Sequence, residues 1–258
     1  MNKLNTSLRH VALVAALLAL HPASAQTAAP APRLSDGHPD LSGVWWTGGD
    51  LGSPGYQSSN KAAGTGPSGP KMPTFAELYK PEAAEHAKTL RDKNDPTLEC
   101  KPTAFGTLNI RLFDVGAIGQ IVATPGMVVF LQETYHGYQQ IPTDGREHRP
   151  VPPSYRGDAV GHWEGDTFVV ETTNFTDDTW MWAEGRVTFH SDQLKITERY
   201  TRPDANTLVI EAVVEDPAVL TGPWTVPKQT LALAPMDQLL PLICNSAETQ
   251  ALMNDAQQ

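Results

Sequence analysis

Residues 158–173 read DAVGHWEGDTFVVETT, and this stretch predicts a β-hairpin. Its two arms, 158–163 and 167–174, are rich in valine, threonine and aromatic residues, which favour strands. Between the arms, Glu164-Gly165-Asp166 has turn chemistry, because glycine tolerates positive φ and aspartate bonds to the backbone nearby. Two strands joined by so short a turn run antiparallel.

Short predicted strands alternate with turn residues from Gly119 to Ile243. Turn residues recur at Thr124-Pro125-Gly126, Thr143-Asp144-Gly145 and Pro203-Asp204-Ala205-Asn206. No helical pattern separates the strands, so a parallel α/β sheet is not expected. We predict a mainly β fold, an antiparallel meander of eight to ten strands that closes into a barrel and so avoids exposed edges. The remaining predicted strands are 119–123, 127–134, 136–141, 187–190, 193–201, 207–214, 224–233 and 239–243.

The residues before this sheet contain the one predicted helix. Residues 74–94 form it, with Thr74 as N-cap and Glu77 three residues later in a capping-box pattern, and Pro81 is expected to split it in two. Residues 48–73 are rich in Gly, Pro, Ser and Asn and predict a long surface loop. Residues 37–258 are expected to form a single domain.

The first 25 residues have the pattern of a cleavable signal peptide. Lys3 and Arg9 precede an apolar run, residues 11–20, and Ala23-Ser24-Ala25 follows with small residues at the cleavage positions. The run is shorter than the roughly 20 residues that span a bilayer, so a retained anchor is the weaker alternative. We expect a periplasmic or secreted protein that begins near Gln26, with a poorly ordered lead-in over 26–36.

The net charge excludes some classes of binding partner, and the cysteine content indicates the cellular compartment. The signal holds two of the 19 basic residues and none of the 29 acidic ones, which leaves a net charge of −12. Such an acidic chain lacks the excess of basic residues with which proteins bind nucleic acid or anionic membranes. Cys100 and Cys244, 144 positions apart, are expected to form one disulfide in an oxidising compartment; a reactive thiol is the alternative.

Several segments together resemble a large group of exported bacterial proteins. They include Pro39-Asp40-Leu41-Ser42-Gly43-Val44-Trp45, residues 121–126, 144–146 and 196–200, the block from Gly161 to Thr173, Pro223-Trp224-Thr225, and Cys244-Asn245. Gly43-Val44-Trp45 also resembles the first-strand motif of lipocalins, although a strand with a packed base would use the same residues. The resemblance implies a lipocalin-like (calycin-type) barrel in an exported protein and names neither a reaction nor a cofactor.

Familiar catalytic and cofactor motifs do not occur in the sequence. It contains no G-x-S-x-G, H-E-x-x-H or Walker pattern, no G-x-G-x-x-G after a predicted strand, and no zinc-spaced Cys/His cluster. The six histidines after the signal are scattered, which leaves open a metal site built from distant strands. We expect no cofactor.

Two residues are candidate acid–base catalysts. Glu198 shares one face of the strand 193–201 with Leu194, Ile196 and Tyr200, and a carboxylate among apolar neighbours pairs with a cation or rises in pKa. His190 could move a proton with Glu198 or Asp192 as partner. The alternatives are a rim salt bridge for Glu198 and a turn histidine bonded to local backbone for His190.

The candidate substrate contacts are basic and aromatic. Arg146, His148 and Arg149 could bind a carboxylate at the barrel mouth, with arginine as a bidentate donor, or form a solvated loop. Trp180 and Trp182, with Met181, form an aromatic patch in the predicted loop after Asp177-Asp178, which could contact a ligand or cover a barrel end. His162 and Tyr200 complete the set.

Two classes of function agree with these residues. One is an exported, cofactor-independent lyase, decarboxylase or isomerase that acts by acid–base chemistry on a small hydrophobic or aromatic acid. In it Arg146 anchors the carboxylate while His190 and Glu198 move protons. The other is a non-catalytic periplasmic carrier of a small hydrophobic ligand. A structural role in the cell envelope is a third alternative.

Overall fold

Strands dominate the computed structural model of the protein, which describes residues 28–46, 73–103, 119–132, 137–183, 186–239 and 244–247. The expected signal peptide, the loop 48–73 apart from Pro73, and the predicted strand 239–243 apart from Leu239 lie outside these residues. The strands are β1 (Gly43–Trp46), β2 (Gly119–Thr124), β3 (Met127–Gln132), β4 (Tyr138–Pro142), β5 (Asp158–Glu164), β6 (Thr167–Thr173), β7 (Trp180–Ala183), β8 (Arg186–Phe189), β9 (Lys195–Asp204), β10 (Thr207–Glu215) and β11 (Trp224–Leu233).

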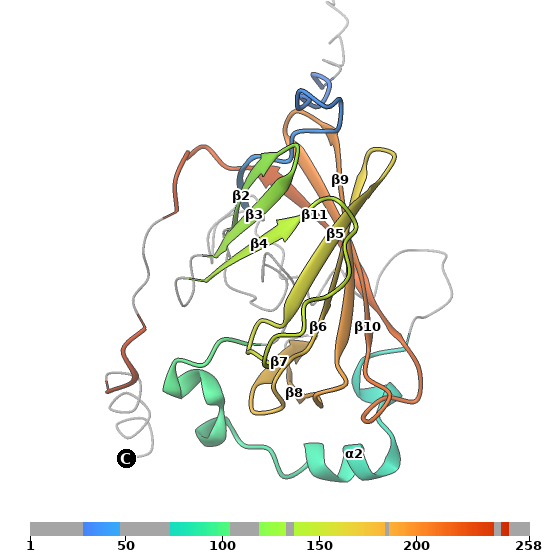
Figure 1. Ribbon diagram of the computed structural model, residues 1–258. Helices are drawn as coiled ribbons and strands as arrows, with labels where there is room; N and C mark the ends of the chain where they lie inside the picture. The colour runs from blue at the N-terminus through green and yellow to red at the C-terminus, as the bar shows by residue number, and fades with distance from the viewer. Residues whose placement is uncertain are drawn as a thin grey trace, which may run out of the picture.

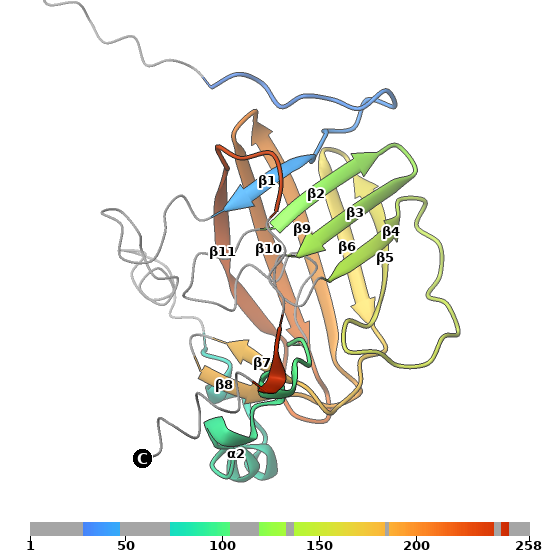
Figure 2. The ribbon, with the colours of Figure 1, turned by 90° about the vertical axis from the view of Figure 1, so that its left-hand side faces the viewer.

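Nine of these strands form one antiparallel sheet that curls into a nearly closed barrel. Their order is β4-β3-β2-β1-β11-β10-β9-β6-β5, so β1 pairs with both β2 and β11 and joins the start of the chain to its end. Figure 1 and Figure 2 show β2, β3 and β4 crossing over the longer strands β5, β6, β9 and β10. Strands β4 and β5 are the two ends of the sheet, and they do not pair with each other through a ladder of hydrogen bonds. The predicted mainly β, lipocalin-like barrel is confirmed.

The hairpin formed by β7 and β8 lies outside this sheet. We predicted that 187–190 would be part of the meander and that Trp180-Met181-Trp182 would lie in a loop, and both predictions are wrong. Strand β6 pairs directly with β9, and β7 and β8 pair only with each other among the described strands. The pattern of residue types predicts a strand but not the sheet to which it belongs.

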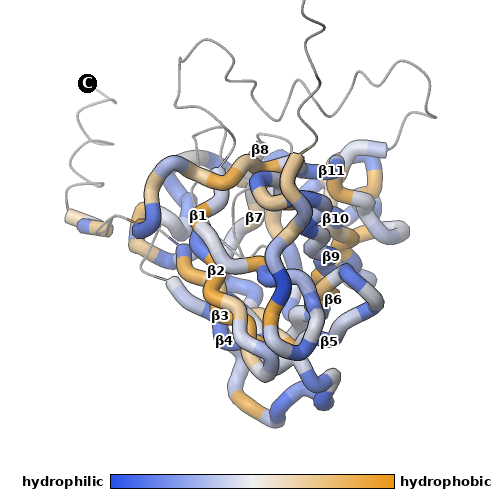
Figure 3. Tube along the Cα trace, turned by 90° about the horizontal axis from the view of Figure 1, so that it is seen from above, coloured by the Kyte–Doolittle hydropathy of each residue, from blue (hydrophilic) through white to orange (hydrophobic). Residues whose placement is uncertain are grey.

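Alternation along the strands separates an apolar interior from a polar exterior. In β9, Ile196, Glu198, Tyr200 and Arg202 are buried, and the residues between them are partly exposed. Figure 3, seen from above, shows hydrophobic and hydrophilic residues interspersed along the strands. Two apolar clusters fill the interior, one around Phe130, Phe168 and Tyr200 and the other around Phe75, Phe175 and Trp224.

Strand β1 is fixed against β9 by Trp45 and Arg202. The guanidinium of Arg202 lies 4.9 Å from the Trp45 ring centroid and donates to the carbonyl oxygens of Asp40 and Ser42. Gly43 has φ of 149°, and a Cβ there would stand 2.5 Å from Leu233, so this start of the strand requires glycine. The first strand therefore has a packed base, as its Gly-x-Trp sequence suggested.

The segment expected as a poorly ordered lead-in is held to the barrel from Ala29 onward, because Ala29 O accepts a hydrogen bond from Ala205 N–H at 2.8 Å. The guanidinium of Arg33 forms two hydrogen bonds with Asp166, of 2.9 and 2.7 Å, in the β5–β6 turn. The ring of His38 stacks on Trp163 at 4.6 Å. These long-range contacts order a segment whose composition alone predicts mobility.

The predicted helix 74–94 is broken into short pieces. They are η1 (Ala76–Leu78), α2 (Pro81–Ala87) and η2 (Asp92–Asn94), and a further short helix, η3 (Pro96–Glu99), follows the predicted range. The capping box is present, since Thr74 N–H donates to Glu77 Oε2 at 2.7 Å and Glu77 N–H donates to Thr74 Oγ1 at 3.3 Å. Pro81 starts α2 at the first helical position, where a missing N–H costs nothing.

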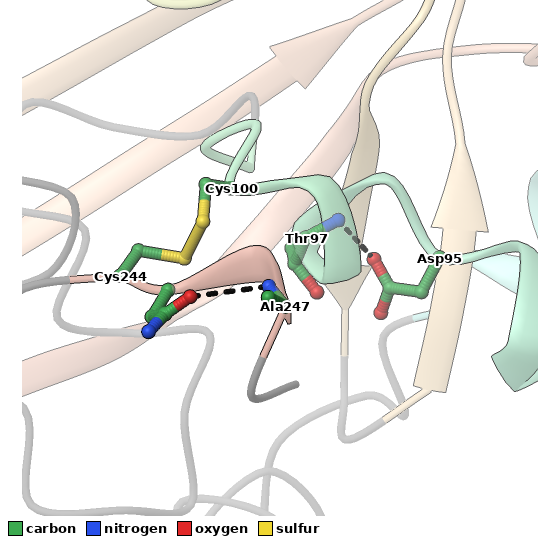
Figure 4. Close-up of a disulfide and its surroundings, with 6 residues drawn as sticks. Asp95, Thr97, Cys100, Cys244 and Ala247 are labelled. Atoms are coloured by element: carbon green, nitrogen blue, oxygen red, sulfur yellow. Dashed lines mark hydrogen bonds between the residues drawn. A yellow bond between two sulfur atoms is a disulfide. The ribbon is translucent and has the colours of Figure 1, made fainter. Parts of the chain in front are cut away.

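The predicted disulfide joins Cys100, at the end of η3, to Cys244, with a Cα–Cα distance of 5.8 Å (Figure 4). It ties the C-terminal residues 244–247 to the helical segment beside the barrel. No helix in the described ranges is long and apolar enough to cross a membrane.

Candidate functional site

Glu198 and Tyr200 form a hydrogen-bonded pair inside the barrel. The hydroxyl of Tyr200 donates to Glu198 Oε1 at 2.8 Å, and the two residues are only 0–3% exposed. The cross-strand neighbours of Glu198 are Val170 on β6 and Ala212 on β10, so its surroundings on either side are apolar. The structure therefore places Glu198 in the interior and not on the rim.

His190 lies at the base of the β7–β8 hairpin and is satisfied there. Its Nδ1 donates to the carbonyl oxygen of Ser191 at 2.9 Å, and its Nε2 lies 3.0 Å from Thr179 Oγ1. Burial lowers the pKa of His190, which keeps the ring neutral. Because both ring nitrogens have these partners, the structure does not form the predicted His190–Glu198 acid–base pair; it favours the alternative of a turn histidine.

Sequence reasoning missed Asp216, which binds Ser191, the residue after His190, and not the His190 ring itself. The buried carboxylate of Asp216 accepts from the backbone N–H and the hydroxyl of Ser191, both at 2.7 Å. It thereby fixes the turn that carries His190. Nothing local in the sequence indicates this, because Asp216 and Ser191 come together only when β9 and β10 pair.

The predicted basic cluster is brought to the outer surface of β5 and β6. Arg146 binds Asp144 through its Nε and a terminal nitrogen. His148 lies between two carboxylates, with Nδ1 3.1 Å from Asp158 and Nε2 3.3 Å from Glu171. These loop residues are therefore anchored rather than freely solvated.

Asp158 is the buried centre of this cluster and was not among the predicted site residues. Its side chain is 1% exposed and accepts from the backbone N–H of Arg149 at 3.0 Å and from its guanidinium at 2.8 and 2.6 Å. Burial alone would raise the pKa of Asp158, but the hydrogen bonds from Arg149 and His148 lower it below its ordinary value. Asp158 thus fixes the loop that follows β4.

The other predicted substrate contacts are dispersed. His162 is exposed on the outer face of β5, with Nε2 3.2 Å from Glu164, which also pairs with Arg199. Trp180 is partly buried in β7, and the side chain of Trp182 lies outside the described part of the chain. His162, Trp180 and Tyr200 do not line the cleft that holds Arg146.

A cleft of about 590 Å³ lies at the gap between β4 and β5. Of the predicted substrate contacts, Arg146 and Arg149 line it. The cleft also exposes Arg156, Tyr138 and Tyr155, and no acidic residue is among the described residues that line it. Asp144 pairs with Arg146 and Asp158 pairs with Arg149, so these two positive charges are partly balanced. The arrangement can hold a small anion against arginine and tyrosine side chains.

Arg156 and Tyr155 were missed by sequence reasoning. They occupy the middle of a turn, 154–157, closed by a hydrogen bond from Gly157 N–H to Ser154 O at 3.2 Å. The glycine after Arg156 signals the turn, but not that its side chains face the gap between two distant strands. No cluster of three metal-ligating side chains occurs among the residues that the structure describes.

No family model, curated protein or solved structure matches the chain. The resemblance to exported lipocalin-like proteins therefore stays a prediction beyond the fold itself.

Proposed function

We propose that this protein is an exported barrel that binds a small hydrophobic or aromatic acid in the β4–β5 cleft. The observation that carries the proposal is the charge of the cleft: three arginines and no described acidic residue line it, in a protein with ten more acidic than basic residues. An anion is the ligand charge that such a lining attracts, and arginine binds carboxylates in bidentate fashion.

The size and remaining lining support a small organic ligand. A volume of about 590 Å³ falls in the range of roughly 300–1,000 Å³ typical of small-molecule sites. Tyr138 and Tyr155 supply apolar ring surface, while Gln139 and Gln140 supply polar groups. Two aromatic side chains beside cations suit an acid with a hydrophobic or aromatic body.

The geometry favours binding over turnover. Glu198 faces the interior at the level of Gly161 on β5, because Gly161 pairs with Val170 and Val170 pairs with Glu198. The ring of Phe168 covers Gly161 so closely that a Cβ there would stand 2.4 Å from it. Neither Glu198 nor Phe168 is among the residues that line the cleft, so a ligand bound there does not contact Glu198.

A lyase, decarboxylase or isomerase is the second candidate function, and the buried Tyr200–Glu198 hydrogen bond is what favours it. A carboxylate that accepts from a phenol in an apolar interior has the form of an acid–base pair. The periplasmic or secreted location is likewise a proposal, supported by the signal-like residues 1–25 and by the disulfide.

The test uses the oxidised protein, purified after export, and a panel of matched ligands. Benzoate, phenylacetate and cyclohexanecarboxylate are titrated by calorimetry beside their neutral amides. We expect saturable binding of acids, at least about tenfold tighter than of amides, that weakens as salt increases. Equal binding of acids and amides, or none by any acid, would refute the proposal.

The same samples separate carrier from enzyme. Each acid is incubated with the protein and followed by proton NMR, with the Glu198→Gln variant in parallel. A carrier leaves every acid unchanged. Conversion by the wild type that disappears in Glu198→Gln would establish the second candidate instead.

A further inference from the structure

One edge of strand β4 is unpaired and lies along the cleft. The large sheet ends at β4 and β5, and among the described strands β4 pairs only with β3. The cleft touches three consecutive residues of β4, Tyr138, Gln139 and Gln140. Because consecutive side chains point to opposite faces of a strand, a cavity that touches all three follows the backbone edge and not one face.

The register of β3 and β4 fixes which backbone groups this edge presents. Gly137 O, just before β4, accepts a hydrogen bond of 2.8 Å from Gln132 N–H at the end of β3. Bonded and non-bonded pairs alternate in an antiparallel ladder, so the bonds to β3 belong to residues 137, 139 and 141. The N–H and C=O groups of Tyr138 and Gln140 therefore point away from β3, toward the gap.

These outward groups have no hydrogen-bond partner within the described ranges. The gap to β5 is bridged at two other places. Gly145 N–H donates to Gly161 O at 2.9 Å, and the side-chain amide of Gln139 donates to Arg156 O at 2.9 Å. Gln140 lies between the two bridges, so its backbone donor and acceptor stay available to a ligand.

Arginine side chains supply positive charge beside this edge. Arg146 binds Asp144 and Arg149 binds Asp158, each through its Nε and Nη2 groups. The Nη1 group of each arginine makes no hydrogen bond with the part of the chain that the structure describes, and the two side chains are 53% and 65% exposed. A carboxylate can therefore approach the Nη1 side of either guanidinium without displacing its aspartate.

We infer that the acid bound in the cleft is an N-acylated amino acid, whose amide pairs with the backbone of Gln140 and whose carboxylate lies against Arg146 and Arg149. The inference rests on the proposed function and deepens it by naming the chemical class of the acid. In such a ligand the amide N–H and the carboxylate belong to one residue. They can bond to the C=O and N–H of Gln140 as a residue of an added antiparallel strand does. The acyl group then lies against Tyr138 and Tyr155, which line the same cleft.

The first test changes the ligand. Benzoylglycine and its ester analogue O-benzoylglycolate have the same charge and nearly the same shape, but the ester has an oxygen in place of the N–H. We expect calorimetric titration of the oxidised, exported protein to show benzoylglycine binding at least about tenfold tighter than the ester, because the ester oxygen would face the carbonyl of Gln140. Saturable binding of both acids with equal affinity would refute the inference and leave the proposed function standing. If no acid binds, both fall.

The second test removes the donor from the edge of β4. Gln140→Pro deletes the backbone N–H together with the side chain, whereas Gln140→Ala deletes the side chain alone. Pro142 already occupies the next outward position of β4, where a missing N–H breaks no ladder bond, so the strand should accept a second proline. We expect Gln140→Pro to weaken benzoylglycine binding at least about tenfold and Gln140→Ala less than about threefold, with similar melting temperatures. Equal loss in the two variants would refute the pairing.

NMR of the wild-type protein reads the same contact without a substitution. On addition of benzoylglycine the backbone amide proton of Gln140 should shift downfield and exchange more slowly with solvent. The amide proton of Gln139, which is already bonded to β3, is the internal control and should shift less. A Gln140 amide resonance that stays in place at saturating benzoylglycine would overturn the inference, and this measurement decides if Gln140→Pro does not fold.

Discussion

Replacing Asp158 by asparagine tests whether the buried carboxylate holds the loop after β4. The change keeps the size of the side chain but removes the negative charge, and the new amide NH₂ faces donors on Arg149 and His148. Asp158 is 1% exposed and accepts three hydrogen bonds of 2.6–3.0 Å from Arg149, besides its contact with His148 at 3.1 Å. We expect the substitution to destabilise the protein without unfolding it.

The magnitude follows from the burial of each partner. Removing one member of a fully buried ion pair costs roughly 3–5 kcal/mol. The side chain of Arg149 is 65% exposed and that of His148 is 27% exposed, so water can solvate them again and the loss is smaller. We expect the free energy of unfolding to fall by about 2–3 kcal/mol, and the melting temperature of a domain of this size by roughly 4–12 °C.

The pH dependence of this difference has a definite sign. The folded protein lowers the pKa of Asp158, so the unfolded chain binds the proton more readily. The stabilisation by the carboxylate is complete above the unfolded pKa, about 4, and is lost as pH falls through the lower folded value. The gap in melting temperature between wild type and Asp158→Asn should therefore be largest near pH 6 and shrink below pH ~4.

Differential scanning fluorimetry across pH 3–7, with urea unfolding at pH 6, measures both quantities. Asp166→Asn is the matched control, because Asp166 also pairs with an arginine but is 60% exposed. A change in the control as large as in Asp158→Asn would show that charge alone, and not burial, sets the effect. An Asp158→Asn protein as stable as the wild type, or a gap that widens in acid, would refute the reasoning.

Two further predictions concern the covalent tie and the base of β1. The double variant Cys100→Ser/Cys244→Ser should lose about 2–5 kcal/mol of unfolding free energy, since the bond closes a chain separation of 144 residues; an unchanged urea midpoint would contradict this. Arg202→Met leaves the carbonyl oxygens of Asp40 and Ser42 without their buried donor and should cost roughly 3 kcal/mol, whereas Arg199→Met, at the surface, should change the urea midpoint little. Equal loss in the two arginine variants would argue against a structural role for Arg202.

Much of the fold is visible in local sequence because its causes are local. The strands from β2 to β6 and from β9 to β11 lie close to the predicted ranges, since period-two burial and turn residues act over a few neighbours. The capping box at Thr74 and Glu77 is equally local. The helix prediction failed in its length because short helices depend on packing as well as on caps.

The candidate site was harder to predict because its parts are distant in sequence. Arg146 and Arg149 were found, but Asp158 and the free edge of β4 were not. The edge is free only because β4 and β5 do not pair, and Asp158 matters only because it is buried under Arg149 and His148. No pattern within one strand contains these relations.

The sequence by itself determined that residues 158–173 form a hairpin of an antiparallel sheet, and that Cys100 and Cys244 form a disulfide. Period-two alternation and turn chemistry are properties of neighbouring residues, so they need no tertiary information. Only the tertiary structure decided that β1 closes against β11, that β7 and β8 leave the sheet, and that β4 and β5 stay apart. Strand twist and long-range packing set these pairings. Because of these pairings, Arg156 and the chain around Asp158, at the end of the hairpin, lie at the edge of the cleft.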